Sequence, residues 1–309
     1  MSATAGSRLG GRVATVARAV ADRLVRRVEP VEPRRVLIAH HLLLGDTLML
    51  TALVAKLRAN HPEADIAMTV PRAIAPLYAT RPYGSIVLVS VATGETLAYF
   101  DDGGFLTDLR TAAVSALAAR ELGRRDESLA ILGTGVQARL QASLHAGVLP
   151  LREVRIWGRD RAKADRCARD VAASLPGASV TVAASPAEAA ASARLIVTAT
   201  ASRAPLLSAA DLRPGTHVSA VGADSPGKQE LDPEILRRAT LLLVDSKAQC
   251  ERLGELQHAK SETARAIELG WFCERPAPYD RSGITVADFT GLGAEDLYIA
   301  EACLRGLGA

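Results

Sequence analysis

The stretch from Ala130 to Ser143, AILGTGVQARLQAS, decides the fold. An apolar run ends in Gly133-Thr134-Gly135-Val136-Gln137-Ala138, which has the spacing G-x-G-x-x-A, and a helical pattern follows. In a strand-to-helix turn of this kind the first glycine makes the tight turn and the second lets the backbone approach a pyrophosphate at the helix N-terminus. The stretch therefore predicts a dinucleotide site, with a plain glycine turn as the alternative. The predicted cofactor-binding residues of this turn are Gly133, Thr134, Gly135, Val136 and Gln137.

Short apolar segments alternate with helical patterns on both sides of this turn. Strands are predicted within residues 34–40, 64–70, 128–135, 153–160, 179–184, 194–202, 216–224 and 239–246. Helices are predicted over 47–62, 106–125, 136–148, 161–175 and 185–193, and a hairpin over 85–102. Such alternation predicts an α/β fold with a doubly wound, mostly parallel sheet. Thr107 is the predicted N-cap of the helix over 106–125.

The end of the strand after the glycine turn bears on which dinucleotide is bound. It reads Trp157-Gly158-Arg159-Asp160, with no carboxylate at Gly158, where an acidic residue would accept the ribose 2′-hydroxyl of NAD. The guanidinium of Arg159 suits a 2′-phosphate. The sequence therefore favours NADP, and Asp160 leaves NAD open.

The composition excludes several classes of function. The chain has 309 residues and a net charge of +3, and residues 1–35 carry eight arginines against three acidic residues, so the basic character belongs to this tail. The four cysteines are too far apart for a zinc site, and no metal is expected. Eleven scattered aromatic residues do not predict a nucleic-acid surface. The expected setting is cytoplasmic, with the tail either solvated or lying on a membrane surface.

Five motifs in order give a family resemblance. They are TGETLAYFDDGGFLTDLRTAAVSALAARELG (93–123), AILGTGVQAR (130–139), VGADSPGKQELDPEIL (221–236), LLLVDSKAQCERLGEL (241–256) and ITVADFTGLGAEDLYIA (284–300). From about residue 85 onward the chain resembles the ornithine cyclodeaminase and mu-crystallin family. The resemblance implies a Rossmann-type domain with a second, smaller α/β domain, a nicotinamide cofactor, a small amino or imino acid substrate, and a homodimer.

The resemblance also implies roles for individual residues. Arg110 matches the arginine that binds the substrate carboxylate, and Asp224 matches the catalytic acid/base. Thr200, Asp245 and Ser246 follow predicted strands and are expected to line the cofactor crevice. Lys228 and Glu230 are interpreted as a structural charge pair at a helix start. Read without the resemblance, Arg110 is a solvent-facing arginine and Asp224 a turn residue.

The N-terminal part of the chain differs from the pattern of that family. The family supplies a substrate-binding lysine from a G-x-K strand, and the first lysine here, Lys56, falls on a predicted helix. Residues 34–84 instead resemble the first βαβ unit of heptosyltransferase-like glycosyltransferases, with Asp46 at the position of the catalytic base. Nothing later resembles the nucleotide-sugar domain that such an enzyme needs.

These observations predict a basic tail over 1–33, an α/β region over 34–110 completed by 291–309, and a Rossmann-type domain over 111–290. The leading hypothesis is a cyclodeaminase-like, NAD(P)-dependent enzyme that transfers hydride at Cα of a small amino or imino acid. The alternatives are a non-catalytic NADP(H)-binding protein like the crystallins, or a remnant glycosyltransferase.

Overall fold

The computed structural model describes residues 35–38, 65–68, 84–89, 96–100 and 102–306. The basic tail over 1–33, most of the glycosyltransferase-like segment, Asp46 and Lys56 lie outside these residues. No helix in the described part of the chain is long and apolar enough to cross a membrane.

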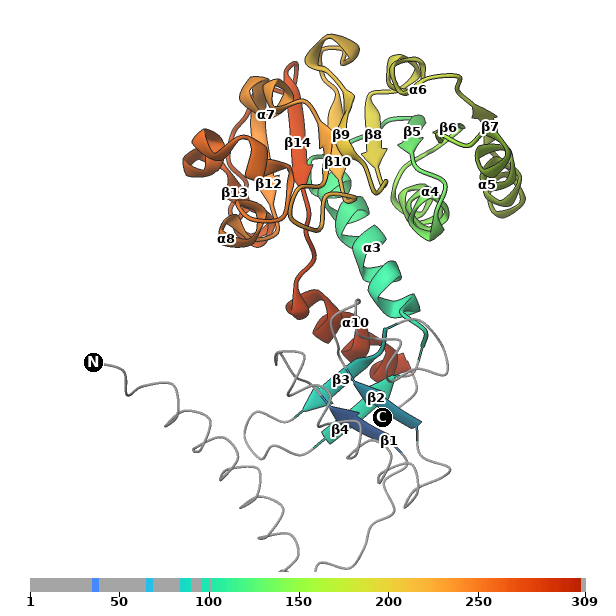
Figure 1. Cartoon of the computed structure of the whole chain (residues 1–309), viewed down its shortest axis with the longest axis vertical. Coiled ribbons are helices and arrows are strands. Elements are labelled where there is room, and N and C mark those ends of the chain that lie inside the picture. The colour runs from blue at the N-terminus through green and yellow to red at the C-terminus, as the bar shows by residue number, and fades with distance from the viewer. Residues whose placement is uncertain (1–34, 39–64, 69–83, 90–95, 101, 307–309) are drawn as a thin grey trace, which may run out of the picture.

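An eight-stranded sheet forms the centre of the larger part of the molecule (Figure 1). Its strands follow the order β13-β12-β14-β10-β8-β5-β6-β7, and every pairing between neighbours is parallel. The bounds are β5 Ser128–Leu132, β6 Glu153–Trp157, β7 Ser179–Val182, β8 Leu195–Thr198, β10 His217–Ala220, β12 Ala239–Val244, β13 Ile267–Glu268 and β14 Ile284–Asp288. The predicted doubly wound parallel sheet is confirmed. Because all strands run the same way, their carboxyl ends and the loops that follow them meet along one edge.

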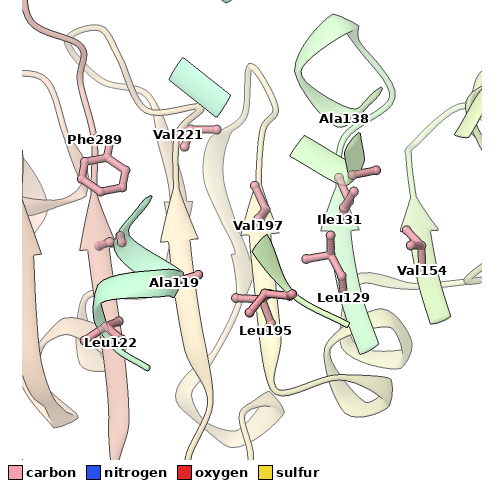
Figure 2. Packing of buried hydrophobic residues seen from close by; sticks show 14 of the residues in the cluster. Ala119, Leu122, Leu129, Ile131, Ala138, Val154, Leu195, Val197, Val221 and Phe289 are labelled. Carbon is pink, nitrogen blue, oxygen red and sulfur yellow. The ribbon is translucent and has the colours of Figure 1, made fainter. Parts of the chain in front are cut away.

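Successive residues of the central strands point to opposite faces of the sheet. Leu129 and Ile131 of β5 pack in one hydrophobic cluster, whereas Ala130 and Leu132 pack in another. Figure 2 shows the first cluster, in which Ala119 of a long helix lies over the sheet near Leu195 and Val197. The sheet is therefore covered on both faces, as its nearly continuous apolar strands require.

The helices divide between these two faces. The first face is covered by α3 (Phe105–Glu121), α4 (Val136–Val148), α5 (Arg161–Ser174) and α9 (Leu269–Glu274). The second is covered by α6 (Pro186–Ser192), α7 (Pro233–Arg238), α8 (Lys247–Cys250) and the 3-10 helix η3 (Glu255–His258). The remaining 3-10 helices are η2 (Ala209–Asp211) and η4 (Lys260–Arg265).

Helix α3 connects the large sheet to the smaller part of the molecule (Figure 1). Near its C-terminus Ala118, Ala119 and Leu122 belong to the first cluster, whereas Leu106 at its start packs with Ile86 and Ala300 in a third. The smaller part holds the antiparallel hairpin of β3 (Ile86–Val89) and β4 (Thr96–Phe100), the parallel pair β1 (Arg35–Ile38) and β2 (Asp65–Met68), and the C-terminal helix α10 (Gly293–Gly306). The boundary expected at residues 110 and 111 falls inside α3.

Some local predictions were wrong. The N-cap of α3 is Gly104, with a φ of 85°, and Asp102 accepts the backbone N–H groups of Gly104 and Leu106. Thr107, the predicted cap, lies inside the first turn. Two strands were not predicted: β9 (Arg203–Leu207) and β11 (Gln229–Leu231) pair with each other in a separate parallel sheet.

Candidate functional site

Two cavities lie beside the glycine turn, at the carboxyl edge of the sheet. The larger, of about 1020 Å³, is lined by residues of the turn, the end of β6 and the segment after β8. The smaller, of about 510 Å³, lies between α3, the start of α4 and the turn before α10. Gly135 and Ala199 line both cavities, so the two spaces share a wall. Dinucleotides and their substrates bind at this edge in doubly wound sheets.

The glycine turn has the geometry that its spacing predicts. Gly133 has a φ of 143°, and a Cβ there would lie 2.5 Å from the carbonyl oxygen of Ala199, so only glycine lets the turn pass the end of β8. Gly135 is the N-cap of α4, and no described atom lies within 4 Å of the position of a Cβ there. Ala138, in the first turn of α4, is fully buried. The free N–H groups of the first turn of α4 therefore face a space that admits a pyrophosphate.

The end of β6 lies close against the glycine turn. A Cβ on Gly158 would overlap Cγ2 of Thr134, so a side chain there requires this methyl group to move. The carboxylate of Asp160 accepts the backbone N–H of Lys163 at 3.1 Å and caps α5. Arg159, Lys163 and Arg203 line the same cavity and are exposed. The lining of this cavity is positively charged, since it carries these three cations and one carboxylate, that of Asp160.

Arg110 lines the smaller cavity and is held by α10. Its Nη1 donates to Glu295 at 2.8 Å and its Nε to Asp296 at 3.0 Å, whereas Nη2 has no hydrogen-bond partner among the described residues. Burial raises the pKa of Glu295, against the influence of Arg110, which lowers it. The guanidinium also lies against Gly291, where a Cβ would overlap Nη1. The structure thus fixes Arg110 and leaves Nη2 as a donor for a ligand.

Asp224 lies across the smaller cavity, after β10. Its Oδ1 accepts from Nζ of Lys228 at 2.6 Å and from Oγ of Ser225 at 2.8 Å. Its Oδ2 has no partner in the described part of the chain. The carboxylate is partly exposed to the cavity, with Oδ2 unoccupied for proton exchange with a ligand. Lys228 thus pairs with Asp224 and not with Glu230, contrary to the predicted charge pair.

The structure brings most of the predicted site residues to these two spaces. Gly133, Thr134, Gly135, Arg159 and Thr200 line the larger cavity, and Arg110, Gly135, Val136, Gln137 and Asp224 line the smaller. Gln137 donates to the backbone oxygen of Asp108 at 2.9 Å, which ties α4 to α3.

Asp245 and Ser246 line neither cavity. The carboxylate of Asp245 instead accepts the backbone N–H groups of Thr290 and Gly291, at 2.7 and 2.6 Å, and holds the turn that contacts Arg110. Asp245 thus contributes to the site through this turn.

Sequence reasoning missed two kinds of residue. Lys163 and Arg203 belong to no sequence motif, because only the fold of α5 and β9 brings them to the same cavity. The second kind is buried acids: Glu255 and Asp288 were not singled out, and Glu230 was interpreted only as part of a charge pair with Lys228, since acidic residues are rarely buried. The described residues hold no group of three or more side chains suited to bind a metal ion.

Comparison with known proteins identifies the family of this chain. The model of the ornithine cyclodeaminase/mu-crystallin family matches residues 53–304. The chain belongs to this family. The match begins inside the segment that resembles a glycosyltransferase and covers all of the residues that form the two cavities.

Relatives of this family member include a protein of Rhizobium meliloti named as a dehydrogenase, 45% identical over 225 residues, which are 70% of this chain and 68% of that protein. Among solved structures, iminosuccinate reductase of Paracoccus denitrificans in complex with NAD⁺ is similar with a TM-score of 0.66 and 32% identity, over 72% of this chain and 69% of that one. A lysine cyclodeaminase gives a TM-score of 0.67 and 35% identity, over 75% and 68%. The Rossmann-type fold agrees with these structures.

Proposed function

We propose that the protein binds a nicotinamide dinucleotide in the larger cavity and acts on a small amino or imino acid in the smaller one. The observation that carries this proposal is the wall that the two cavities share at Gly135 and Ala199. A dinucleotide whose pyrophosphate lies at the start of α4 reaches that wall with its nicotinamide end. A substrate in the smaller cavity then lies beside the ring. Membership of the family and the NAD⁺ complex of iminosuccinate reductase support the proposal.

Within this arrangement Arg110 and Asp224 have separate roles. Nη2 of Arg110 binds the substrate carboxylate through a charge-assisted hydrogen bond. Oδ2 of Asp224 exchanges a proton with the substrate nitrogen across the cavity. The nicotinamide, when bound, accepts hydride from Cα of an amine or donates hydride to the carbon of an imine. Lys228 holds Oδ1 of Asp224 at 2.6 Å and so fixes the orientation of this carboxylate.

The cofactor is proposed to be NADP. Arg159, Lys163 and Arg203 supply three positive charges to the larger cavity, and the carboxylate of Asp160 is used as a helix cap. A 2′-phosphate carries nearly two negative charges and forms strong hydrogen bonds with guanidinium groups. Gly158 has no side chain, so the usual carboxylate partner of an NAD ribose is absent at this position.

A non-catalytic, cofactor-binding protein is the second candidate. The observation that favours it is that Glu295 and Asp296 both hold Arg110, so the charge of the guanidinium is already balanced before a substrate carboxylate arrives. A substrate then gains less from binding at Arg110 than it does from an unpaired arginine.

A homodimer is also proposed. Leu297 and Tyr298 of α10 are large apolar side chains that are 44% and 67% exposed in the single chain. The related archaeal alanine dehydrogenase is described as a dimer with bound NAD. Light scattering coupled to size-exclusion chromatography tests this, and a mass of one chain contradicts it.

The two candidate functions separate in one set of assays. NADPH and NADH are titrated into the protein, and the oxidation of either is then followed with cyclic imines and with pyruvate plus ammonia. Ornithine is tested with the oxidised dinucleotides by the release of ammonia, because cyclodeamination returns the hydride and leaves the cofactor unchanged. Turnover that Asp224→Asn abolishes supports the enzyme. Tight binding without turnover of any substrate supports the non-catalytic protein, and an absence of binding contradicts both.

A further inference from the structure

Glu230 is buried between the two loops that face the cavities. It lies on β11 and is fully buried. Its Oε1 accepts the backbone N–H of Thr200 at 2.6 Å, and its Oε2 accepts the backbone N–H of Gly222 at 3.0 Å. Thr200 follows β8 and Gly222 follows β10, which are neighbouring parallel strands. One carboxylate therefore bridges the ends of two strands at the carboxyl edge of the sheet.

The contact between these loops leaves no spare room. A Cβ added at Gly222 would overlap the carbonyl oxygen of Thr200 and would lie 2.5 Å from Oε2 of Glu230. The loop after β8 supplies Ala199 and Thr200 to the cofactor cavity, whereas the loop after β10 supplies Val221 and Asp224 to the substrate cavity. The distance between cofactor and acid/base thus depends on the position of one glutamate.

Two further buried carboxylates hold Glu230 itself. Oε1 and Oε2 of Glu255 accept the backbone N–H groups of Glu230 and Leu231, at 2.7 and 3.1 Å. The carboxylate of Asp288 accepts the N–H groups of Glu255 and Leu256, each at 2.9 Å. Asp288 ends β14 in the centre of the sheet. The chain of contacts therefore anchors Glu230 to the central sheet and restricts its movement.

We propose that Glu230 is a positioning residue that sets the loop of Thr200 and the loop of Asp224 at the separation needed for hydride transfer. The proposal rests on the proposed function, because it needs a cofactor in the larger cavity and a substrate in the smaller. Glu230 touches neither ligand and acts through the backbone N–H groups of Thr200 and Gly222. A carboxylate suits this role because each of its oxygens accepts one N–H group, and charge-assisted hydrogen bonds are the strong ones.

The protonation state of Glu230 gives the proposal a second readout. Burial raises the pKa of Glu230 to about 7, and the hydrogen bonds from the Thr200 side chain and the two backbone groups oppose this shift. The facing titratable groups are Glu255, whose pKa burial raises well above its ordinary value, and Asp288, whose pKa burial raises to about 7. A protonated Glu230 presents one hydroxyl group in place of an acceptor. Both loops are therefore held fully only when pH exceeds the pKa of Glu230.

The test compares Glu230→Gln with Glu234→Gln, the same change at a partly exposed position of α7. The glutamine side chain keeps the size of glutamate but turns an N–H donor toward one of the two backbone donors. The chain has two tryptophans; Trp157 lines the cofactor cavity, and Trp271 is exposed on α9. In a Trp271→Phe background, energy transfer from Trp157 to the reduced nicotinamide reports cofactor binding alone. Circular dichroism first establishes that each variant is folded at the assay temperature.

The expected result is an NADPH Kd that rises about tenfold in Glu230→Gln, the scale of one charged hydrogen bond, with no change in Glu234→Gln. At saturating NADPH, the kcat of Glu230→Gln is also expected to fall, because Asp224 is displaced as well. The unsubstituted protein is expected to bind NADH more tightly at about pH 8 than at about pH 6, and Glu230→Gln to lose most of that difference. NADH is used for the pH series because it has no 2′-phosphate to titrate.

If Glu230→Gln does not fold, Glu230→Asp provides the same comparison, since it keeps the charge and shortens the reach by one methylene. Cofactor affinity and kcat equal to those of the unsubstituted protein in a folded Glu230 variant overturn the inference and leave the proposed function standing. Failure of the unsubstituted protein to bind either dinucleotide overturns the proposed function and the inference with it.

Discussion

The carboxylate of Asp245 accepts the backbone N–H of Gly291 at 2.6 Å and thereby ties the end of β12 to the turn between β14 and α10. Gly291 has a φ of 85°, a conformation that favours glycine, and the guanidinium of Arg110 packs against it. The same carboxylate accepts the N–H of Thr290 at 2.7 Å. A residue expected to contact the cofactor thus shapes the surface on which Arg110 rests.

Asp245→Asn is expected to impair substrate binding and to spare cofactor binding. An amide presents one acceptor and one donor to backbone groups that are all donors. The loss of a hydrogen bond to a charged group lowers the free energy of unfolding by about 1.5–3 kcal/mol. Urea denaturation measures this, and steady-state kinetics is expected to show a raised substrate KM.

The control for Asp245→Asn is Asp280→Asn, which removes a similar side-chain contact to a backbone N–H, that of Ser282, on an exposed turn. This control is expected to leave the substrate KM unchanged. A weaker NADPH affinity with an unaltered KM in Asp245→Asn contradicts the role assigned to Asp245.

Arg159→Ala is expected to weaken NADPH far more than NADH. Only NADPH carries the 2′-phosphate that the exposed guanidinium of Arg159 is proposed to bind. Loss of one charge-assisted hydrogen bond or of two raises the NADPH Kd about 10- to 100-fold. Titrations of both cofactors by fluorescence measure the ratio.

Arg169→Ala serves as the matched control for Arg159→Ala, because Arg169 is exposed on α5 and lines neither cavity. Its two affinities are expected to match those of the unsubstituted protein. Equal losses of NADPH and NADH in Arg159→Ala remove the phosphate role.

The sequence predicted the strands that are continuous apolar runs, because a strand covered on both faces has few polar residues. It missed β9 and β11, which are short and pair with each other outside the large sheet, with Gln229 opposite Arg203. The family motif that contains Asp288 was noted without recognition of β14. The conformation of the glycine turn was predictable because local chain geometry sets it.

Glu230 illustrates what sequence could not provide. In the segment Lys228-Gln229-Glu230-Leu231 the two charges resemble a surface pair. The fold instead places Lys228 beside Asp224 and turns Glu230 into the interior, where three backbone segments supply its partners and its fixed position. Those partners lie 8, 25 and 30 residues away, so no local pattern reveals them.

Gly158→Ala is expected to destabilise the protein and to weaken cofactor binding, because the added Cβ overlaps Cγ2 of Thr134 in the glycine turn. Overpacking of a tight contact costs about 1–3 kcal/mol. The second substitution Thr134→Ser removes this methyl group and keeps the hydroxyl. Urea denaturation and NADPH titration of the single and double variants are expected to show a loss in the first and a recovery in the second.

The outcome that contradicts this explanation of Gly158 is additivity. If Thr134→Ser adds its own effect to that of Gly158→Ala without recovery, the two positions do not interact, and another constraint keeps position 158 a glycine. Gly177→Ala is the control, since no described atom lies within 4 Å of a Cβ there.

Buried histidines are expected to make the fold sensitive to acid. Burial lowers the pKa of His145 to about 4 and that of His217 to about 3. The unfolded chain takes up a proton on each below about pH 6.5, so their contribution to stability is lost as pH falls from about 6.5 to about 4. The raised pKa values of Glu230 and Asp288 act in the opposite direction, because the native state retains protons there up to about pH 7.

The two opposing effects separate in His145→Gln, which removes one titrating histidine and keeps a side chain able to donate to the backbone oxygen of Gln141. Its absolute stability is expected to be lower, and the decline of its unfolding free energy between about pH 6.5 and 4 is expected to be shallower than in the unsubstituted protein. Urea denaturation at a series of pH values gives both slopes. Parallel curves mean that the pKa of His145 is the same in the native and unfolded states, which the complete burial of its side chain opposes.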